Sequence, residues 1–311
     1  MFDVPTVLIL GAGASMPYGF PSGRRLLFDI RDTLATGVQH MNSGGDPDRA
    51  PIVYRAVRWF KFNDLKIKFF VDALNETMHP SIDAFLERYS EFMDIGKVSL
   101  AASLIPYEQR NMLMQRDRDE VQWYEYFFNL VRDPDEFMKR NLSVVTFNYD
   151  RSFEYFLYYA FMNSFHLDSA QAIELMKNIP IVHIYGNLGA PKFLSKDGRD
   201  YKYDVTVEDI QKCIDGLKII SEVEDTHPTF PQVHTLVAEA QKVIFIGFSF
   251  LPANVQRLKL RPHLTEVVGT VYYMKQGEIT RVQSTLLKYL TRTPSLYDLD
   301  ALNFLRETDF F

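Results

Sequence analysis

Cysteine is nearly absent from this sequence, whose 311 residues contain only Cys213. A disulfide framework within the chain and a four-cysteine zinc site are both excluded, so we expect no metal and a reducing, cytoplasmic location. Long apolar runs are missing too. The run at residues 7–10 is too short for a signal peptide, and no stretch approaches the roughly 20 apolar residues that span a membrane.

An excess of basic residues is also lacking. The chain has 34 Lys and Arg against 40 Asp and Glu, a net charge of −6, so direct nucleic-acid binding is not expected, although binding through a partner stays open. The composition, 47% hydrophobic and 24% charged, is that of a globular protein. The 25 Phe and 17 Tyr favour core packing together with a homo-oligomer surface.

Apolar runs and helical patterns alternate along the chain. Buried strands are predicted at residues 4–10, 142–147, 179–185, 242–248 and 267–274. Helices are predicted at residues 152–165, 170–177, 233–241 and 280–289. This alternation predicts an α/β fold, a Rossmann-like parallel sheet with helices on both faces.

One stretch interrupts the alternation. Residues 50–140 show helical spacing without a strong strand signal, which predicts a helical insertion within a single domain covering residues 1–311. Residues 37–51 are polar and rich in Gly, Pro and Asp, which is typical of a surface loop.

The first predicted strand ends in a glycine-rich turn. Gly11 and Gly13 allow a backbone to approach a phosphate closely, and the helix beyond would supply N–H donors. Many buried strands end in the same way for packing alone. Met16 occupies the third small position of the dehydrogenase fingerprint, and no acid closes a second strand about twenty residues on, so the turn is not of the dehydrogenase type.

Polar residues follow two further strands. Asn148 and Asp150 come after the second strand, where an amide can hold a ribose hydroxyl or a water, although either residue could simply cap a helix. His183 lies near the end of the third strand and is a candidate base, although a buried histidine with a satisfied ring is the commoner arrangement. Because parallel strands end at one edge of a sheet, these groups are expected to face one crevice.

The fourth strand ends in Gly247, which would let a ligand approach the backbone. Ser249 and Asn254 follow it and could bond phosphate or ribose, or form a tight turn with a helix cap.

Together these motifs resemble the sirtuin-like domains, most closely the bacterial branch that serves anti-phage defence as NAD hydrolases. The resemblance rests on GAGAS at residues 11–15, the Gly-Phe-Pro-Ser that contains Pro21, TFNYD at residues 146–150, the strand with His183, and GFS followed by Asn254. Residues 81–86 also look like a segment of that branch's helical insertion.

The resemblance implies an enzyme that uses NAD as its substrate and needs no metal. Asn148 would be catalytic, with Asp150 steadying it. The NAD-binding residues would be Gly11, Ala12, Gly13, Ser15, Pro21, Gly247, Ser249 and Asn254. Enzymes of this kind are commonly silent until a trigger or partner arrives, such as a defence ATPase or a nucleic-acid sensor.

One position departs from the family pattern. The family places histidine directly before the glycine, where this chain has Tyr185, and His183 lies two residues earlier. Alternate residues of a strand share a face, so either side chain could serve as the base. Two rival functions stay open: a non-catalytic module that binds NAD or ADP-ribose, and a protein deacylase, which the missing four-cysteine zinc module disfavours.

Overall fold

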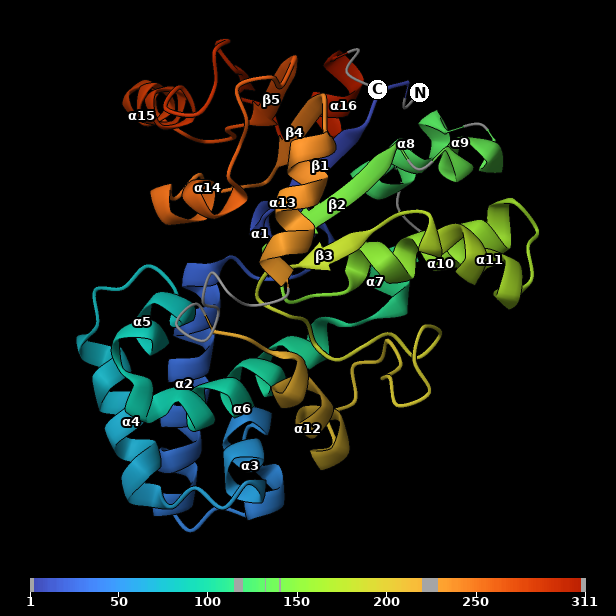
Figure 1. The fold of residues 1–311 in the computed structure, drawn as a ribbon. Helices are drawn as coiled ribbons and strands as arrows, with labels where there is room; N and C mark the ends of the chain where they lie inside the picture. Colours follow the sequence, from blue (N-terminus) through green and yellow to red (C-terminus); the bar gives the residue numbers. More distant parts are fainter. Residues whose placement is uncertain (1–2, 115–119, 132, 140, 220–228, 309–311) are drawn as a thin grey trace.

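The computed structural model describes residues 3–114, 120–131, 133–139, 141–219 and 229–308. At its centre lies a six-stranded sheet in which all neighbouring strands are parallel, in the order β3-β2-β1-β4-β5-β6 (Figure 1). The strands are β1 (Thr6–Leu10), β2 (Leu142–Thr146), β3 (Ile181–His183), β4 (Lys242–Ile246), β5 (Glu266–Thr270) and β6 (Ser295–Tyr297). The predicted Rossmann-like α/β architecture is confirmed. From β1 the next strands in sequence, β2 and β3, are added on one side, and β4, β5 and β6 are added on the other, so the switch point of the fold lies between β1 and β4.

Three strands differ clearly from the prediction. β5 ends at Thr270, so residues 271–274, which were predicted as part of this strand, lie beyond it. β3 stops at His183, and Ile184 and Tyr185 belong to a turn in which the Gly186 N–H donates to the His183 carbonyl at 3.3 Å. The predicted shared strand face of His183 and Tyr185 was therefore wrong. β6 was not predicted, because its three residues include no apolar run and lie partly exposed at the edge of the sheet.

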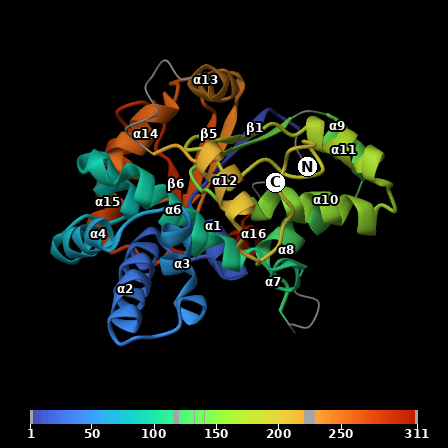
Figure 2. The ribbon, with the colours of Figure 1, turned by 90° about the horizontal axis from the view of Figure 1, so that it is seen from below.

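Helices cover both faces of the sheet. In Figure 2, α13 and α14 lie on one side of the strands, and α8, α10 and α16 lie on the other. The α-helices are α1 (Ala12–Ser15), α2 (Gly23–Asn42), α3 (Ile52–Trp59), α4 (Asp64–Glu76), α5 (Ile82–Arg88), α6 (Met93–Leu104), α7 (Arg110–Met114), α8 (Trp123–Leu130), α9 (Pro134–Met138), α10 (Ser152–Ser164), α11 (Ser169–Lys177), α12 (Val207–Gly216), α13 (Thr229–Glu239), α14 (Pro252–Leu258), α15 (Gln276–Leu286) and α16 (Ala301–Glu307). Within the described ranges, no helix combines the length and apolarity that crossing a membrane would need.

The elements described between β1 and β2 are all helical. Figure 1 shows α2 to α6, joined by α12, as a group beyond the strand ends at which α1 begins. The prediction of a loop from residue 37 was wrong for residues 37–42, which continue α2. Gly37 permits this, because a Cβ there would lie 2.3 Å from the Tyr54 side chain of the neighbouring α3. The predicted end of the insertion, residue 140, lies outside the described residues.

Two glycine turns meet at the switch point. The Gly11 N–H donates to the Ile246 carbonyl at 3.1 Å, and the Gly13 N–H donates to the Gly247 carbonyl at 3.0 Å. A Cβ on Gly13 would lie 2.8 Å from the Gly247 Cα, and a Cβ on Gly247 would lie 2.2 Å from the Ala14 nitrogen. The turns after β1 and β4 thus touch backbone to backbone, which only glycine allows.

We predict that Gly247→Ala will lower the free energy of unfolding by about 2 kcal/mol more than Gly44→Ala does. Both glycines have positive φ, +60° and +74°, so both variants suffer the backbone penalty of roughly 1–2 kcal/mol for an L-residue. Only at Gly247 does the new methyl group meet other atoms, since nothing lies within 4 Å of a Cβ at Gly44. Urea unfolding of both variants measures the difference, and equal losses would show that the two turns do not depend on their close contact.

Candidate functional site

The strand register brings four predicted site segments to one edge of the sheet. Leu10, the last residue of β1, pairs with Thr146 of β2 and with Ile246 of β4, and Thr146 pairs with His183 of β3. The four strands β1, β2, β3 and β4 therefore end at the same level of the sheet. The residues that follow them surround the two glycine turns, at the edge where open α/β sheets bind ligands in a crevice.

Asn148 ties the end of β2 to the turn after β1. Its Nδ2 donates to the Gly11 carbonyl at 2.9 Å and to Ser15 Oγ at 3.1 Å, and its own N–H donates to Thr146 Oγ1 at 3.0 Å. These two acceptors fix the orientation of the amide group. Oδ1 makes no hydrogen bond within the described part of the chain, and Asn148 is only half-buried. The site thus presents one fixed acceptor at the crevice.

His183 has both ring nitrogens engaged. Nδ1 donates to the Asn148 carbonyl at 2.8 Å, and Nε2 lies 2.6 Å from Glu154 Oε1 on α10. Burial by itself would lower the pKa of His183, but the charge and hydrogen bond of Glu154 act in the opposite direction and the net pKa is raised. His183 is therefore paired with a buried glutamate that favours its protonated form, and its other ring nitrogen fixes the backbone of Asn148.

Asp150 lies beneath Asn148 in a polar pocket. It accepts hydrogen bonds from the Ser152 N–H at 3.1 Å and from the Ser152 hydroxyl, which in turn contacts the Tyr124 hydroxyl at 2.7 Å. Burial raises the pKa of the Asp150 carboxyl, although hydrogen bonds from Ser152 and Ser15 oppose the shift. A cavity of about 10 Å³ lies between these side chains, Asn148 and Glu154, which is room for one water molecule.

Tyr185 reaches across the crevice to α14. Its hydroxyl donates to Asn254 Oδ1 at 2.8 Å and accepts from Arg257 Nη1 at 3.2 Å, and its ring packs against Phe147. Burial raises the pKa of Tyr185 to about 12, with Arg257 opposing the shift. The structure therefore brings together Tyr185, one of the two candidate bases, and Asn254, a predicted NAD-binding residue, whereas His183 faces α10 instead.

The remaining predicted residues lie at the rim. Ala12 and Ser249 are exposed, and Ser249 follows the β4 turn directly. Pro21 precedes Ser22, whose hydroxyl caps α2 by accepting from the Arg25 N–H at 3.3 Å. Pro21 thus lies directly before the start of α2.

The helical group contributes one residue that the sequence reading did not assign. Asp83 of α5 accepts a hydrogen bond from the Tyr149 hydroxyl, next to Asn148 in the chain. Burial raises the pKa of the Asp83 carboxyl, and the Tyr149 hydrogen bond opposes this. The resemblance of residues 81–86 was the only signal that pointed to this segment.

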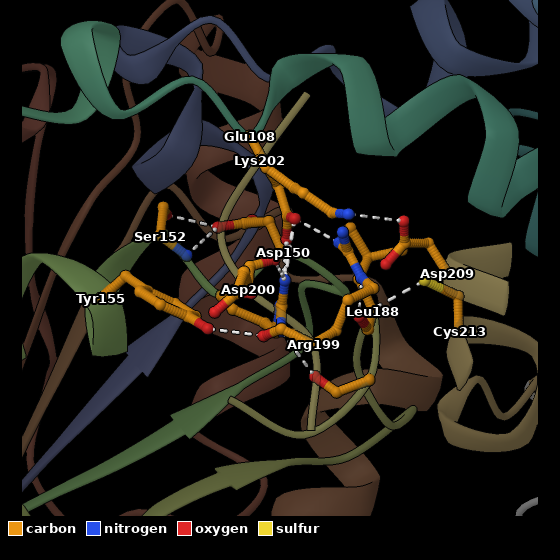
Figure 3. A network of polar contacts seen from close by, with 12 residues as sticks. Glu108, Asp150, Ser152, Tyr155, Leu188, Arg199, Asp200, Lys202, Asp209 and Cys213 are labelled. Carbon is orange, nitrogen blue, oxygen red and sulfur yellow. Dashed lines mark hydrogen bonds and ion pairs between the residues drawn. The ribbon is translucent and has the colours of Figure 1, made fainter. Parts of the chain in front are cut away.

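A buried ion network holds the chain that follows β3, at residues 189–200 (Figure 3). Glu108 accepts a bidentate hydrogen bond from Arg151, at 2.8 Å and 2.9 Å, and also bonds Arg199. All three side chains are 0–1% exposed. Arg151 also donates to the Gly189 and Arg199 carbonyls, so it fastens the chain after β3 to the start of α10. No sequence motif marked these residues, because their partners are far apart in the chain.

A larger cavity lies elsewhere. It measures about 110 Å³ and is lined by residues that include Glu266 and Ser295, the first residues of β5 and β6. It therefore sits at the amino-terminal edge of the sheet, opposite the glycine turns. Among the described residues no group of three or more His, Cys, Asp or Glu side chains is placed to hold a metal ion.

Comparisons with known proteins found similarity to solved structures but no family. No protein-family model matches the sequence, and no curated protein matches it. Among solved structures, the chain is similar to the structure of Sir2Tm bound to a propionylated peptide, with 98% of this chain and 91% of that one covered, 13% identity and a TM-score of 0.37. A likeness at this level carries no argument, and the architecture rests on the sheet itself.

We predict that His183 will titrate above the ordinary histidine pKa of about 6.5 and that Glu154→Gln will lower its pKa, because the carboxylate that favours the imidazolium is removed. NMR titration of the ring measures both values. Glu174→Gln, an exposed acid on α11, is the control and should leave His183 unchanged.

The same pair gives a pH-dependent stability. Since the folded pKa is raised, the advantage of the wild type over Glu154→Gln should be present below about pH 6.5 and should decline as the pH rises through the folded value. A stability difference that grows with pH would contradict the ion pair.

We predict that Glu108→Gln will cost about 3–5 kcal/mol in the free energy of unfolding, since it leaves two buried guanidinium groups without their shared counter-charge. The matched control is Glu208→Gln, which removes an exposed partner of Lys212 and should cause no measurable loss. Urea unfolding compares them, and a loss at Glu108 no larger than at Glu208 would refute the role of the network.

Proposed function

We propose that this chain is an NAD hydrolase that cleaves the nicotinamide–ribose bond and gives nicotinamide and ADP-ribose. The observation that carries the proposal is the state of Asn148. Its amide nitrogen is fixed on the turn after β1 while its Oδ1 is left without a partner in the described residues, at the switch point where open α/β sheets bind nucleotides. A fixed acceptor is what a ribose hydroxyl or an attacking water requires.

Cleavage of this bond depends more on the positioning of ribose and water than on acid catalysis. Nicotinamide leaves from a cationic ring, so no proton needs to be delivered to it, and the ribose passes through a state resembling an oxocarbenium ion. In this proposal Asn148 holds ribose or water, and Asp150 below it steadies the local network. Gly11, Ala12, Gly13 and Ser15 would line the phosphates, and Gly247, Ser249 and Asn254 would hold the adenosine half.

The base remains a choice between two residues. Tyr185, with a pKa of about 12, is neutral at ordinary pH and is suited to donating a hydrogen bond. His183 is the better candidate, but Glu154 raises its pKa, and only the neutral ring can accept a proton. If His183 is the base, nicotinamide release therefore rises with pH.

The biological role we propose is an effector of anti-phage defence that depletes NAD in the cytoplasm. Its support is the motif resemblance at the strand ends, not the geometry. The same resemblance supports a homo-oligomer that is switched on by a partner such as a defence ATPase or a nucleic-acid sensor.

A second candidate is a module that binds NAD or ADP-ribose without turnover. The observation in its favour is that both nitrogens of His183 are already bonded, which leaves no free base in this state. A protein deacylase is a weaker candidate, because a single cysteine cannot build the four-cysteine zinc module of that class.

We predict that Asn148→Ala will reduce nicotinamide release by about 10²-fold or more, with a much smaller change in ADP-ribose affinity. Nicotinamide is measured with purified protein and in cells that express it, and affinity by calorimetry. Asn178→Ala is the matched control, because this well-buried amide lies at the end of α11, away from the crevice, and should leave release unchanged.

Three results separate the candidates. Full activity in a folded Asn148→Ala variant would move the catalytic centre elsewhere. Tight NAD binding by a wild-type protein that releases no nicotinamide under any condition would favour the binding module. Failure of the wild type to bind either NAD or ADP-ribose would contradict both.

A further inference from the structure

Arg257 of α14 places a guanidinium at the crevice without an acidic partner. Its Nη1 donates to the Tyr185 hydroxyl at 3.2 Å and to Asn254 Oδ1 at 3.4 Å, and both acceptors are neutral. No carboxylate of the described residues lies within ion-pair distance, and the side chain is half-buried. The backbone is anchored separately, because the Arg257 carbonyl is 3.0 Å from His234 Nε2.

The two fully buried arginines of the described residues are compensated. Arg151 and Arg199 share Glu108 in the core, and the exposed Arg25 and Arg58 pair with acids on their own or the next helix. A cation that is partly withdrawn from water without a counter-charge loses solvation free energy that a bound anion can restore. Arg257 therefore has the character of an anion-binding residue.

The acids nearest to this point do not provide that counter-charge. Asp83 and Glu87 of α5 are close enough for their charges to act on Tyr185, but neither forms an ion pair with Arg257. The Asp83 carboxylate accepts the Tyr149 hydroxyl instead. The guanidinium keeps its other N–H groups available for a ligand.

The position of Arg257 matches the expected path of a dinucleotide. Tyr185 follows β3 while Arg257 lies on the helix after β4, and β2 and β1 run between those two strands. Their contact therefore spans three strand spacings, roughly 14 Å, over the ends of β2 and β1. A ligand lying on the turn at Gly11 and Gly13 would pass beside this contact.

We infer that Arg257 is a substrate-binding residue that holds the diphosphate of the dinucleotide in the crevice, an inference that rests on the proposed function. A planar guanidinium presents parallel donors that match phosphate oxygens. Asn254, one helical turn earlier on the same helix, then faces the same ligand. Tyr185 holds both side chains in position.

The test is calorimetric titration of ADP-ribose, inorganic pyrophosphate and adenosine into the wild type and into Arg257→Met and Arg257→Lys. We expect Arg257→Met to weaken ADP-ribose at least 10-fold and to abolish pyrophosphate binding, with adenosine unchanged. Arg257→Lys keeps the charge, so its affinity for ADP-ribose should lie between that of the wild type and that of Arg257→Met. Arg281→Met, on the exposed face of α15, is the control and should bind like the wild type.

The outcomes distinguish this inference from the proposed function. Equal ADP-ribose affinity in the wild type and a folded Arg257→Met variant overturns the inference and leaves the function standing. Pyrophosphate binding that needs Arg257, without any binding of ADP-ribose or NAD, supports an anion site and overturns the function. No binding of pyrophosphate or ADP-ribose by the wild type overturns both. If Arg257→Met does not fold, an ADP-ribose affinity of Arg257→Lys equal to that of the wild type decides against the guanidinium.

Discussion

The backbone of the turn after β1 lies directly on the backbone of the turn after β4, and the candidate site is organised around this contact. Gly13 donates to the Gly247 carbonyl, and neither turn has room for a Cβ toward the other. This contact lies between β1 and β4, at the switch point of the sheet, and the ends of β2, β1 and β4 are in register there. The glycines are thus required by the fold, whatever ligand lies above them.

The glycine motif after β1 therefore serves the packing of the two turns. The N–H groups of Gly11 and Gly13 are already bonded to β4 and its turn, so they do not form a free cradle for phosphate. A charged ligand at this edge needs donors from elsewhere. Arg257 on α14 is suited to supply them, and the contact of Tyr185 with Arg257 places that charge above the two turns.

Two buried charge systems hold the groups that surround the crevice. His183 and Glu154 fix the Asn148 backbone, and Glu108 with Arg151 and Arg199 fastens the chain that follows β3. Both are buried, so the loss of one partner from either system would leave an uncompensated buried charge. The orientation of Asn148 is consequently set by the core, which is how a site can be preorganised before a ligand arrives.

The sequence predicted the parts of this arrangement that depend on local pattern. Apolar runs located five of the six strands, and the glycine or polar residues after them located the crevice edge. The α2 extension through residues 37–42 was missed, because Gly37 reads locally as a loop residue and its packing against Tyr54 is a tertiary feature. The partners of His183 and Tyr185 could not be predicted either, since strand periodicity ends at His183 and their neighbours Glu154 and Arg257 come from different helices.

The central claim is that a dinucleotide binds over the two glycine turns, and a crystal structure with ADP-ribose bound tests it most directly. The account predicts the diphosphate between the ends of β1 and β4, within hydrogen-bond distance of Arg257, with a ribose hydroxyl on Asn148 Oδ1. Density for the ligand only in the cavity beside Glu266 and Ser295, at the opposite edge of the sheet, would contradict it.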